Sequence, residues 1–182
     1  MSRYKLDPAK TALLVVDIQE RLLAAMEPGA QERLVRRSVA AITGAKALGI
    51  PVFATEQYPK GLGPTVTAVR AALGEVAPTE KVQFSCLSPA LSAGLTGRDQ
   101  VLLVGMETHV CVFQTARDLA EKSKIPYLCV DAVLSRTEED RRVGIELCQE
   151  VGAVATSVEA ALFDLLGKAG TPEFKQVSQA VK

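Results

Sequence analysis

Apolar, β-rich runs alternate with helical stretches along this chain of 182 residues. The first run, Thr11–Val16, is apolar without alternation, which is typical of a strand covered on both faces of a sheet. Strands separated by helices imply right-handed crossovers. The sequence therefore predicts an α/β protein with a three-layer Rossmann-like fold, in which helices cover both faces of a mainly parallel central sheet. We expect residues 1–182 to form one domain.

The other expected elements follow from the same alternation. Further strands are predicted at Pro51–Thr55, Lys81–Phe84, Gln100–Gly105, Pro126–Val130 and Ala153–Thr156. Helices are predicted at Gln31–Leu48, Ser88–Leu95, Val110–Lys122, Thr137–Val151 and Val158–Leu166, with a short surface helix from Pro172. The segment Gln57–Pro64, rich in proline and glycine, is expected to be a loop.

Charge and hydropathy indicate which classes of binding partner the chain is expected to lack. The chain has 21 basic and 21 acidic residues, without the basic excess usual in polyanion-binding proteins, so we expect no nucleic-acid partner. The cluster Arg33, Arg36 and Arg37 is interpreted as the solvated face of a helix rather than a phosphate site. No opening segment resembles a signal peptide, and the run Ala12–Val16 is too short to span a membrane. We expect no membrane partner and a cytoplasmic location, with four cysteines that remain reduced.

The carboxyl ends of the predicted strands mark the candidate site, because ligands of open parallel sheets bind there. Cys111 is the most informative residue at this edge, since it opens a helix after a tight turn. A helix amino terminus favours the thiolate, and its N–H groups can hold an oxyanion. The alternative is a buried apolar cysteine, which is how we interpret the other three. The residues that follow the strands are Asp17, Glu56, Gln57, Gly105–Cys111 and Asp131.

Asp17 and Lys81 each have a structural alternative. Asp17 precedes Glu20 by three residues, which resembles a helix-capping arrangement. Lys81 has the apolar neighbours Val82 and Phe84, so it is expected in a buried strand, where it needs a carboxylate partner.

The single histidine of the chain, His109, removes several enzyme classes. It is awkwardly placed, two residues before Cys111, to serve as the partner in a Cys-His dyad. One histidine also excludes a multi-histidine zinc site. Gly61 and Gly63 lack the strand–glycine–helix context of a dinucleotide site. We therefore expect no cofactor and no metal.

Four short motifs, taken together and in order, resemble the isochorismatase-like cysteine hydrolases from about Lys10 to Leu166. The loop Thr55–Gly63 and the tail Pro172–Lys175 are similar to the branch called isochorismatase domain-containing proteins. The motifs are Leu14-Val-Val-Asp17-Ile-Gln19, then Lys81, then Gly105-x-x-Thr108-x-x-Cys111-Val112, then Asp131-Ala132-x-x-Ser135-Arg136.

The resemblance implies a catalytic triad of Asp17, Lys81 and Cys111. Cys111 would attack a carbonyl carbon, while Asp17 would take the thiol proton and return it to the leaving amine. Lys81 would hold the aspartate and favour the thiolate. A cis peptide between Met106 and Glu107 is also implied, which would turn the Glu107 N–H toward the oxyanion beside that of Cys111.

Two departures from the family limit the substrate. Nicotinamidase-type members bind a metal through an aspartate and histidines, which this chain lacks in number, and true isochorismatases lack the cysteine. We therefore expect neither nicotinamide nor isochorismate as the substrate. Glu107, if it points inward, would disfavour anionic substrates by repulsion. Position at strand ends assigns Gln57, Tyr58, Phe84 and Met106 to the substrate pocket.

The leading interpretation is a metal-independent hydrolase that cleaves a small amide or related C–N bond through a covalent thioester on Cys111. The alternative is a non-catalytic binding or assembly protein of the same fold. Nuclease activity is disfavoured by the neutral charge and the lack of a histidine pair. We expect a homo-oligomer, because family members usually associate and the apolar helix Val158–Leu166 offers a contact face.

Overall fold

The structure is a computed structural model that describes residues 4–182. Its centre is a six-stranded sheet in the order β3-β2-β1-β4-β5-β6, and all five strand pairs are parallel. This confirms the predicted sheet. The strands are β1 (Thr11–Val16), β2 (Val52–Gln57), β3 (Thr79–Lys81), β4 (Gln100–Met106), β5 (Ile125–Leu134) and β6 (Val154–Thr156).

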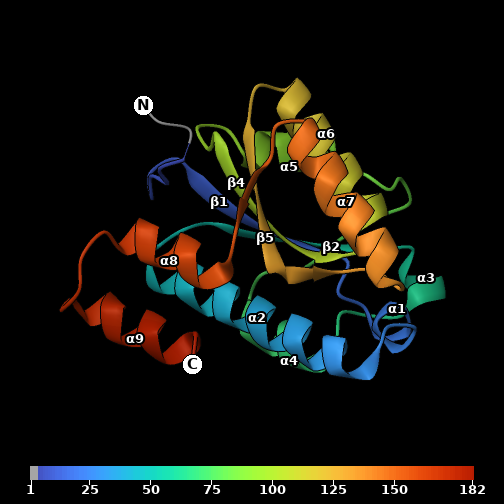
Figure 1. Ribbon diagram of the computed structural model, residues 1–182, viewed down its shortest axis with the longest axis horizontal. Helices are drawn as coiled ribbons and strands as arrows, with labels where there is room; N and C mark the ends of the chain where they lie inside the picture. Colours follow the sequence, from blue (N-terminus) through green and yellow to red (C-terminus); the bar gives the residue numbers. More distant parts are fainter. Residues whose placement is uncertain (1–3) are drawn as a thin grey trace.

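Helices cover both faces of the sheet, which confirms the three layers (Figure 1). One face carries α2 (Pro28–Ala47), α4 (Thr67–Leu73), α8 (Val158–Leu166) and α9 (Pro172–Ala180). The other carries α5 (Pro89–Gly94), α6 (Phe113–Glu121) and α7 (Glu138–Glu150). The short helices α1 (Glu20–Ala24) and α3 (Pro59–Leu62) lie at the edge where β1 and β2 end (Figure 1).

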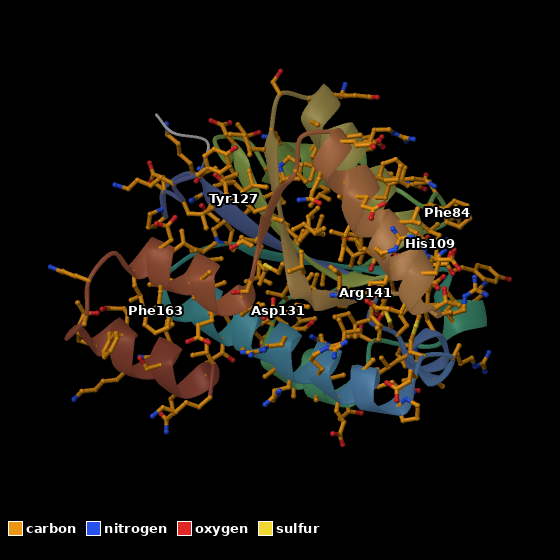
Figure 2. The ribbon with its side chains drawn as sticks, viewed as in Figure 1. Phe84, His109, Tyr127, Asp131, Arg141 and Phe163 are labelled. Carbon is orange, nitrogen blue, oxygen red and sulfur yellow. The ribbon has the colours of Figure 1, made fainter. Side chains whose placement is uncertain are left out.

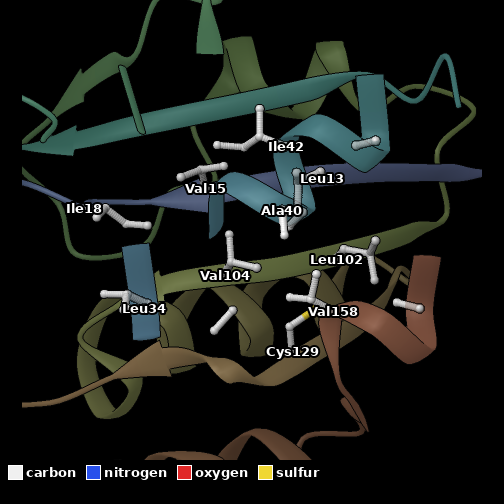
Figure 3. Packing of buried hydrophobic residues seen from close by; sticks show 14 of the residues in the cluster. Leu13, Val15, Ile18, Leu34, Ala40, Ile42, Leu102, Val104, Cys129 and Val158 are labelled. Atoms are coloured by element: carbon white, nitrogen blue, oxygen red, sulfur yellow. The ribbon is translucent and has the colours of Figure 1, made fainter. Parts of the chain in front are cut away.

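Strand side chains alternate between two hydrophobic clusters, one under each helical layer. Leu13 and Val15 of β1 pack in the cluster beneath α2 (Figure 3). Ala12 and Leu14 pack in the cluster beneath α6. All six residues of β1 are buried, because both faces of the strand are covered. The absence of alternation in this run therefore has the physical cause that was predicted.

Caps and terminating residues set the helix bounds. The Thr137 side chain accepts a hydrogen bond from the Asp140 N–H, which confirms Thr137 as the cap of α7. Helix α2 starts three residues earlier than predicted, since the Glu27 carboxylate accepts from the N–H groups of Gly29 and Ala30. The apolar face of α8 is buried, and its partly exposed Phe163 meets Phe174 edge-on, so α8 offers little surface to a partner.

Short elements account for the differences from the predicted order. Helices α1 and α4 were not predicted, and α3 lies inside the segment expected to be a loop. These helices have four to seven residues, too few for a hydrophobic period to stand out. The third strand was placed too late: β3 ends at Lys81, and Val82 and Phe84 are 75% and 52% exposed.

Strand β5 is longer than predicted because it continues through an irregular segment. The register with β4 moves from Leu103↔Leu128 to Gly105↔Val133. The Arg141 side chain donates hydrogen bonds to the carbonyls of Val130 and Val133, which satisfies backbone groups that the irregularity leaves unpaired. Asp131, which was expected to follow the strand, therefore lies within β5.

Candidate active site

Asp17 lies directly after β1 and is fully buried. Its backbone has a φ of 48°, in the left-handed region that few side chains other than Asn and Asp adopt. Its N–H donates to the Thr55 carbonyl at 3.2 Å. The residue before α1 is Gln19, and no side chain among residues 4–182 caps that helix, so the capping interpretation of Asp17 is wrong.

Lys81, at the end of β3, is the ion-pair partner of Asp17. Its Nζ lies 2.7 Å from Asp17 Oδ2 and donates to Gln57 Oε1 at 2.7 Å and to the Phe84 carbonyl at 2.9 Å. Burial by itself lowers the pKa of Lys81, but its neighbours Asp17, Cys86 and Cys111 together outweigh this effect, and the pKa is raised. The ammonium therefore stays charged, and the predicted need for a carboxylate partner is confirmed.

Cys111 lies in η1 (Thr108–Val112), a turn of π-helix that leads into α6. The cis peptide implied by the resemblance is present between Met106 and Glu107. The amides of Val110 and Val112 both donate to the Glu107 carbonyl, at 3.1 and 3.2 Å. The nucleophile candidate thus lies near the start of the helical segment rather than at its first residue.

Two glycines allow the close packing around this turn. A Cβ atom on Gly105 would lie 2.0 Å from the Val16 carbonyl oxygen, and the φ of Gly105 is 126°. A Cβ atom on Gly144 of α7 would lie 2.5 Å from the His109 nitrogen and 2.7 Å from the Thr108 carbonyl carbon. Gly105 therefore lets β4 lie close to the end of β1, and Gly144 lets α7 pack on the backbone of the nucleophile turn.

The electrostatic environment of Cys111 holds the thiol in its neutral form. Burial raises the pKa of the Cys111 thiol, and the neighbouring Asp17 carboxylate raises it further, while Lys81 acts in the opposite direction. The expectation of a thiolate stabilised by the helix terminus is not met. Reaction at this sulfur requires that its proton move to a base, and Asp17 is the carboxylate beside it.

Thr55 and Cys86 join Asp17, Lys81 and Cys111 in one buried cluster. The sequence analysis omitted Thr55 and interpreted Cys86 as a structural residue. The Thr55 hydroxyl donates to Asp17 Oδ1 at 2.7 Å and lies 3.3 Å from Cys86 Sγ. Thr115 joins Cys86 to the nucleophile, because its hydroxyl donates to the Cys111 carbonyl and accepts from the Cys86 N–H. The strand-end rule missed Thr55 because it selects residues after a strand, and Thr55 lies within β2.

Gln57 and Met106, two of the four residues predicted to line the substrate pocket, are buried. Gln57 is buried; its side chain accepts from Lys81 and donates to the Val82 carbonyl, so it holds Lys81 rather than facing a ligand. Met106 is fully buried in the hydrophobic cluster beneath α2. Side chains alternate along β4, so Met106 points into the cluster beneath α2, whereas Cys111 belongs to the cluster beneath α6.

The other two pocket candidates lie at the surface near Lys81. Tyr58 and Phe84 are more than half exposed, and Phe84 lies at the same end of the molecule as His109 (Figure 2). A pocket of about 390 Å³ approaches the cluster from the Lys81 side without including Asp17 or Cys111. It is lined by Tyr58, Pro59, Lys60, Glu80, Lys81, Val82 and Gln83.

Glu107 does not carry an unpaired charge. Its Oε1 accepts from the Arg136 side chain at 3.0 Å and from the Arg136 N–H at 3.2 Å. This ion pair removes the physical reason for expecting anionic substrates to be repelled. His109 is engaged with Ser135, whose hydroxyl lies 3.0 Å from Nδ1.

Glu56 and Asp131, also noted at strand ends, have structural partners. Glu56 accepts from the N–H and hydroxyl of Thr65. Asp131 accepts from the Val158 N–H and pairs with Arg37 at 3.4 Å, between the sheet and α2 (Figure 2). Asp131 therefore fixes the start of α8.

Within residues 4–182, no group of three or more His, Cys, Asp and Glu side chains is arranged to hold a metal ion. In the same part of the chain, no helix has the length and apolar character needed to cross a membrane.

The sequence matches the isochorismatase domain over residues 11–160. The bovine (Bos taurus) isochorismatase domain-containing protein 2 is 35% identical over 96% of this chain and 84% of its own length. The secreted isochorismatase effector Isc1 of Phytophthora sojae is 39% identical over 98% of this chain and 87% of its own length.

Solved structures share the fold. The MAR1 ribonuclease of Caenorhabditis elegans superposes with a TM-score of 0.92 at 36% identity, over 97% of this chain and 92% of that one. YcaC of Escherichia coli, described as an octameric hydrolase of unknown specificity, has a TM-score of 0.87 at 20% identity, over 99% of this chain and 92% of that one. At that identity, YcaC shows likeness of fold alone.

Proposed function

Because this chain belongs to the isochorismatase family, we propose that it is a metal-independent cysteine hydrolase, with Asp17, Lys81 and Cys111 as its triad. Its substrate would be a small amide or a related C–N compound. The observation that carries the proposal is the buried ion pair, 2.7 Å long, between Lys81 and the carboxylate that adjoins the Cys111 thiol. A charged pair is costly to bury for packing alone, whereas perturbed titratable groups gather at catalytic sites.

The first half of the reaction forms the thioester. Asp17 accepts the Cys111 proton as sulfur bonds to the carbonyl carbon, and the amides of Glu107 and Cys111 hold the resulting oxyanion. The C–N bond then breaks, and Asp17 returns the proton to the leaving nitrogen. Lys81 remains charged and holds the carboxylate in place throughout.

The second half releases the acid. Water gives a proton to Asp17 and attacks the thioester carbon, the C–S bond breaks, and Asp17 returns the proton to Cys111. The neutral resting thiol fits this sequence, because each attack then begins with proton transfer to a base that is already in contact.

Substrate turnover and trapping of the intermediate test this proposal. Neutral amides, carbamates and ureas would be screened for release of the amine or ammonia, and intact-mass spectrometry would seek the acyl adduct, mapped by peptide to Cys111. Cys111→Ala should abolish turnover and adduct, while Cys148→Ala, a buried thiol elsewhere, should retain both. Unchanged turnover in folded Cys111→Ala would exclude Cys111 as the nucleophile.

RNA cleavage is the second candidate, favoured by the name of the C. elegans relative. Equal numbers of acidic and basic residues give no general attraction to phosphate, and the Lys81 ammonium is already paired with Asp17. The same variants would be assayed on single-stranded RNA at two salt concentrations. Cleavage that depends on Cys111 and falls with salt would replace the amide proposal.

We also infer a cytoplasmic homo-oligomer that binds a small molecule and neither nucleic acid nor membrane. All four cysteines are free and buried, as suits a reducing compartment. The name of the P. sojae relative makes secretion the alternative to be tested, by locating the tagged chain in its host.

Exposed Tyr58, Val82 and Phe84 supply apolar surface for association. Light scattering that gives a monomer would overturn the oligomer.

A further inference from the structure

The buried cluster contains a second thiol, which the proposed reaction does not use. Cys86 follows β3 and is 2% exposed, and its Sγ lies 3.3 Å from the Thr55 hydroxyl. The same hydroxyl lies 2.7 Å from Asp17 Oδ1. Cys86, Thr55 and Asp17 therefore form one hydrogen-bonded chain that ends on the carboxylate.

The direction of these two hydrogen bonds follows from counting the protons available to them. A threonine hydroxyl has one proton and accepts with its lone pairs. Asp17 Oδ1 is a carboxylate oxygen and only accepts, so the Thr55 proton goes to Asp17. The remaining contact must then run from the Cys86 S–H to the Thr55 oxygen. Burial and the Asp17 charge raise the pKa of Cys86 to about 11, so this thiol keeps its proton at neutral pH.

The arrangement leaves the two oxygens of Asp17 in different states. Oδ1 accepts the Thr55 hydroxyl, whereas Oδ2 lies 2.7 Å from the Lys81 ammonium. Oδ2 is therefore the oxygen that the Thr55 hydroxyl leaves open to the Cys111 thiol. The Thr55 carbonyl also accepts the Asp17 N–H, so one residue fixes both the backbone and the carboxylate of Asp17.

Cys86 is also linked to the nucleophile candidate Cys111 through the Thr115 hydroxyl. Its N–H donates to the Thr115 hydroxyl at 2.9 Å, and that hydroxyl donates to the Cys111 carbonyl at 2.6 Å. A displacement of the nucleophile turn is thus carried to Cys86 and through Thr55 to the carboxylate. Such links keep a base and a nucleophile in mutual alignment.

We propose that Thr55 and Cys86 are positioning residues, which occupy one oxygen of Asp17 and direct the other to the Cys111 thiol. This inference rests on the proposed function, since it assigns Asp17 as the base. The pair touches neither substrate nor leaving group. Its effect is to keep Oδ2 as the proton acceptor and to stabilise the carboxylate in each turnover.

The test compares removal of each hydrogen bond with its conservative replacement. Thr55→Val removes the hydroxyl at nearly constant volume, and Thr55→Ser restores it; Cys86→Ala and Cys86→Ser form the second pair. Turnover and the pH midpoint of Cys111 alkylation by iodoacetamide would be measured for each. Circular dichroism and melting would verify folding, and Cys148→Ala controls for loss of a buried thiol elsewhere.

We expect Thr55→Val to lower turnover by at least about tenfold, as for loss of a hydrogen bond to a charged group. Its alkylation midpoint should move to higher pH, because the less compensated Asp17 charge disfavours the thiolate. Cys86→Ala should change both quantities in the same direction by less. Thr55→Ser and Cys86→Ser should restore most of the turnover and the midpoint, which a purely structural role would not produce.

Two results would overturn the inference while the proposed function survives. One is wild-type turnover and midpoint in Thr55→Val and Cys86→Ala. The other is equal loss in the serine variants, which would indicate packing rather than hydrogen bonding. If wild-type Cys111 showed neither turnover nor faster alkylation than Cys129 and Cys148, the proposed function and this inference would fall together.

Discussion

The Lys81 ammonium lies 2.7 Å from the Asp17 carboxylate, and the two side chains are 3% and 0% exposed. They come from the ends of β1 and β3, which are separated in the sheet by β2. Gln57, at the end of that intervening strand, accepts from Lys81 and so spans the gap. Three adjacent strand ends thus form the charged part of the site.

This ion pair predicts a separation of stability from activity. Lys81→Met or Asp17→Asn alone leaves an unpaired buried charge and should cost about 3–5 kcal/mol of unfolding free energy. The double variant Asp17→Asn/Lys81→Met removes both charges and should regain much of that loss without regaining turnover. Urea unfolding of the four proteins measures the effect. Additive losses in the double variant would mean that the two side chains act independently.

Asp17→Asn should move turnover and alkylation in opposite senses. Loss of the base is expected to lower turnover by about 10²–10⁴-fold. The Asp17 charge raises the pKa of the Cys111 thiol, so its removal lowers that pKa and shifts the alkylation midpoint to lower pH. Rates with iodoacetamide across pH 6 to 10, beside ammonia release, measure both. Asp118→Asn, on α6 and paired with Arg117, is the matched control and should change neither.

The sheet and most of the helices were predictable because their signals are local. The unbroken apolar runs of β1 and β4 indicate strands covered on both faces, and Thr137 indicates a helix start. The short helices α1, α3 and α4 have no such signal. Val82 and Phe84 resembled strand residues by type, yet they lie at the surface, because apolar character alone does not report which side chains find a partner.

The grouping of Asp17 and Cys111 at one edge of the sheet was predictable, whereas the contacts that support them were not. Asp17 and Cys111 follow strands, so the topology alone brings them to one edge. The contacts of Cys86 could not be predicted, because they join it to Thr55 and Thr115, which are 31 and 29 residues away along the chain. Met106 was assigned to the pocket because it ends β4, but its side chain points into the cluster beneath α2.

The four buried thiols predict a loss of stability at alkaline pH. The pKa of Cys86 is raised to about 11 and that of Cys148 to about 12, and burial also raises those of Cys111 and Cys129. In the unfolded chain thiols ionise at about pH 8.5, so below that pH the buried neutral thiols make their full contribution to folding stability. It is lost as the pH rises toward the folded-state values, by about 1.4 kcal/mol per pH unit for each thiol.

Unfolding by urea between pH 8 and 11, under reducing conditions, measures this slope. Cys148→Ala should be less stable at neutral pH and show a shallower decline, by the share of one thiol. Lysines and tyrosines that titrate in the same range cancel in the comparison of the two proteins. Parallel declines would mean that Cys148 ionises equally in the folded and unfolded states.

Gly144→Ala tests the packing of α7 on the nucleophile turn. In an exposed helix this change stabilises by about 0.5–1 kcal/mol. Here the new Cβ would lie 2.5 Å from the His109 nitrogen, so α7 or the turn must move, at a cost of about 1–3 kcal/mol. Because Cys111 is two residues beyond His109, turnover should fall by more than the small loss of stability accounts for. Gly29→Ala, near the start of α2 and in ordinary contact with Glu27, should alter neither turnover nor melting to that degree. Wild-type turnover in Gly144→Ala would show that the turn adapts without moving the thiol from Asp17.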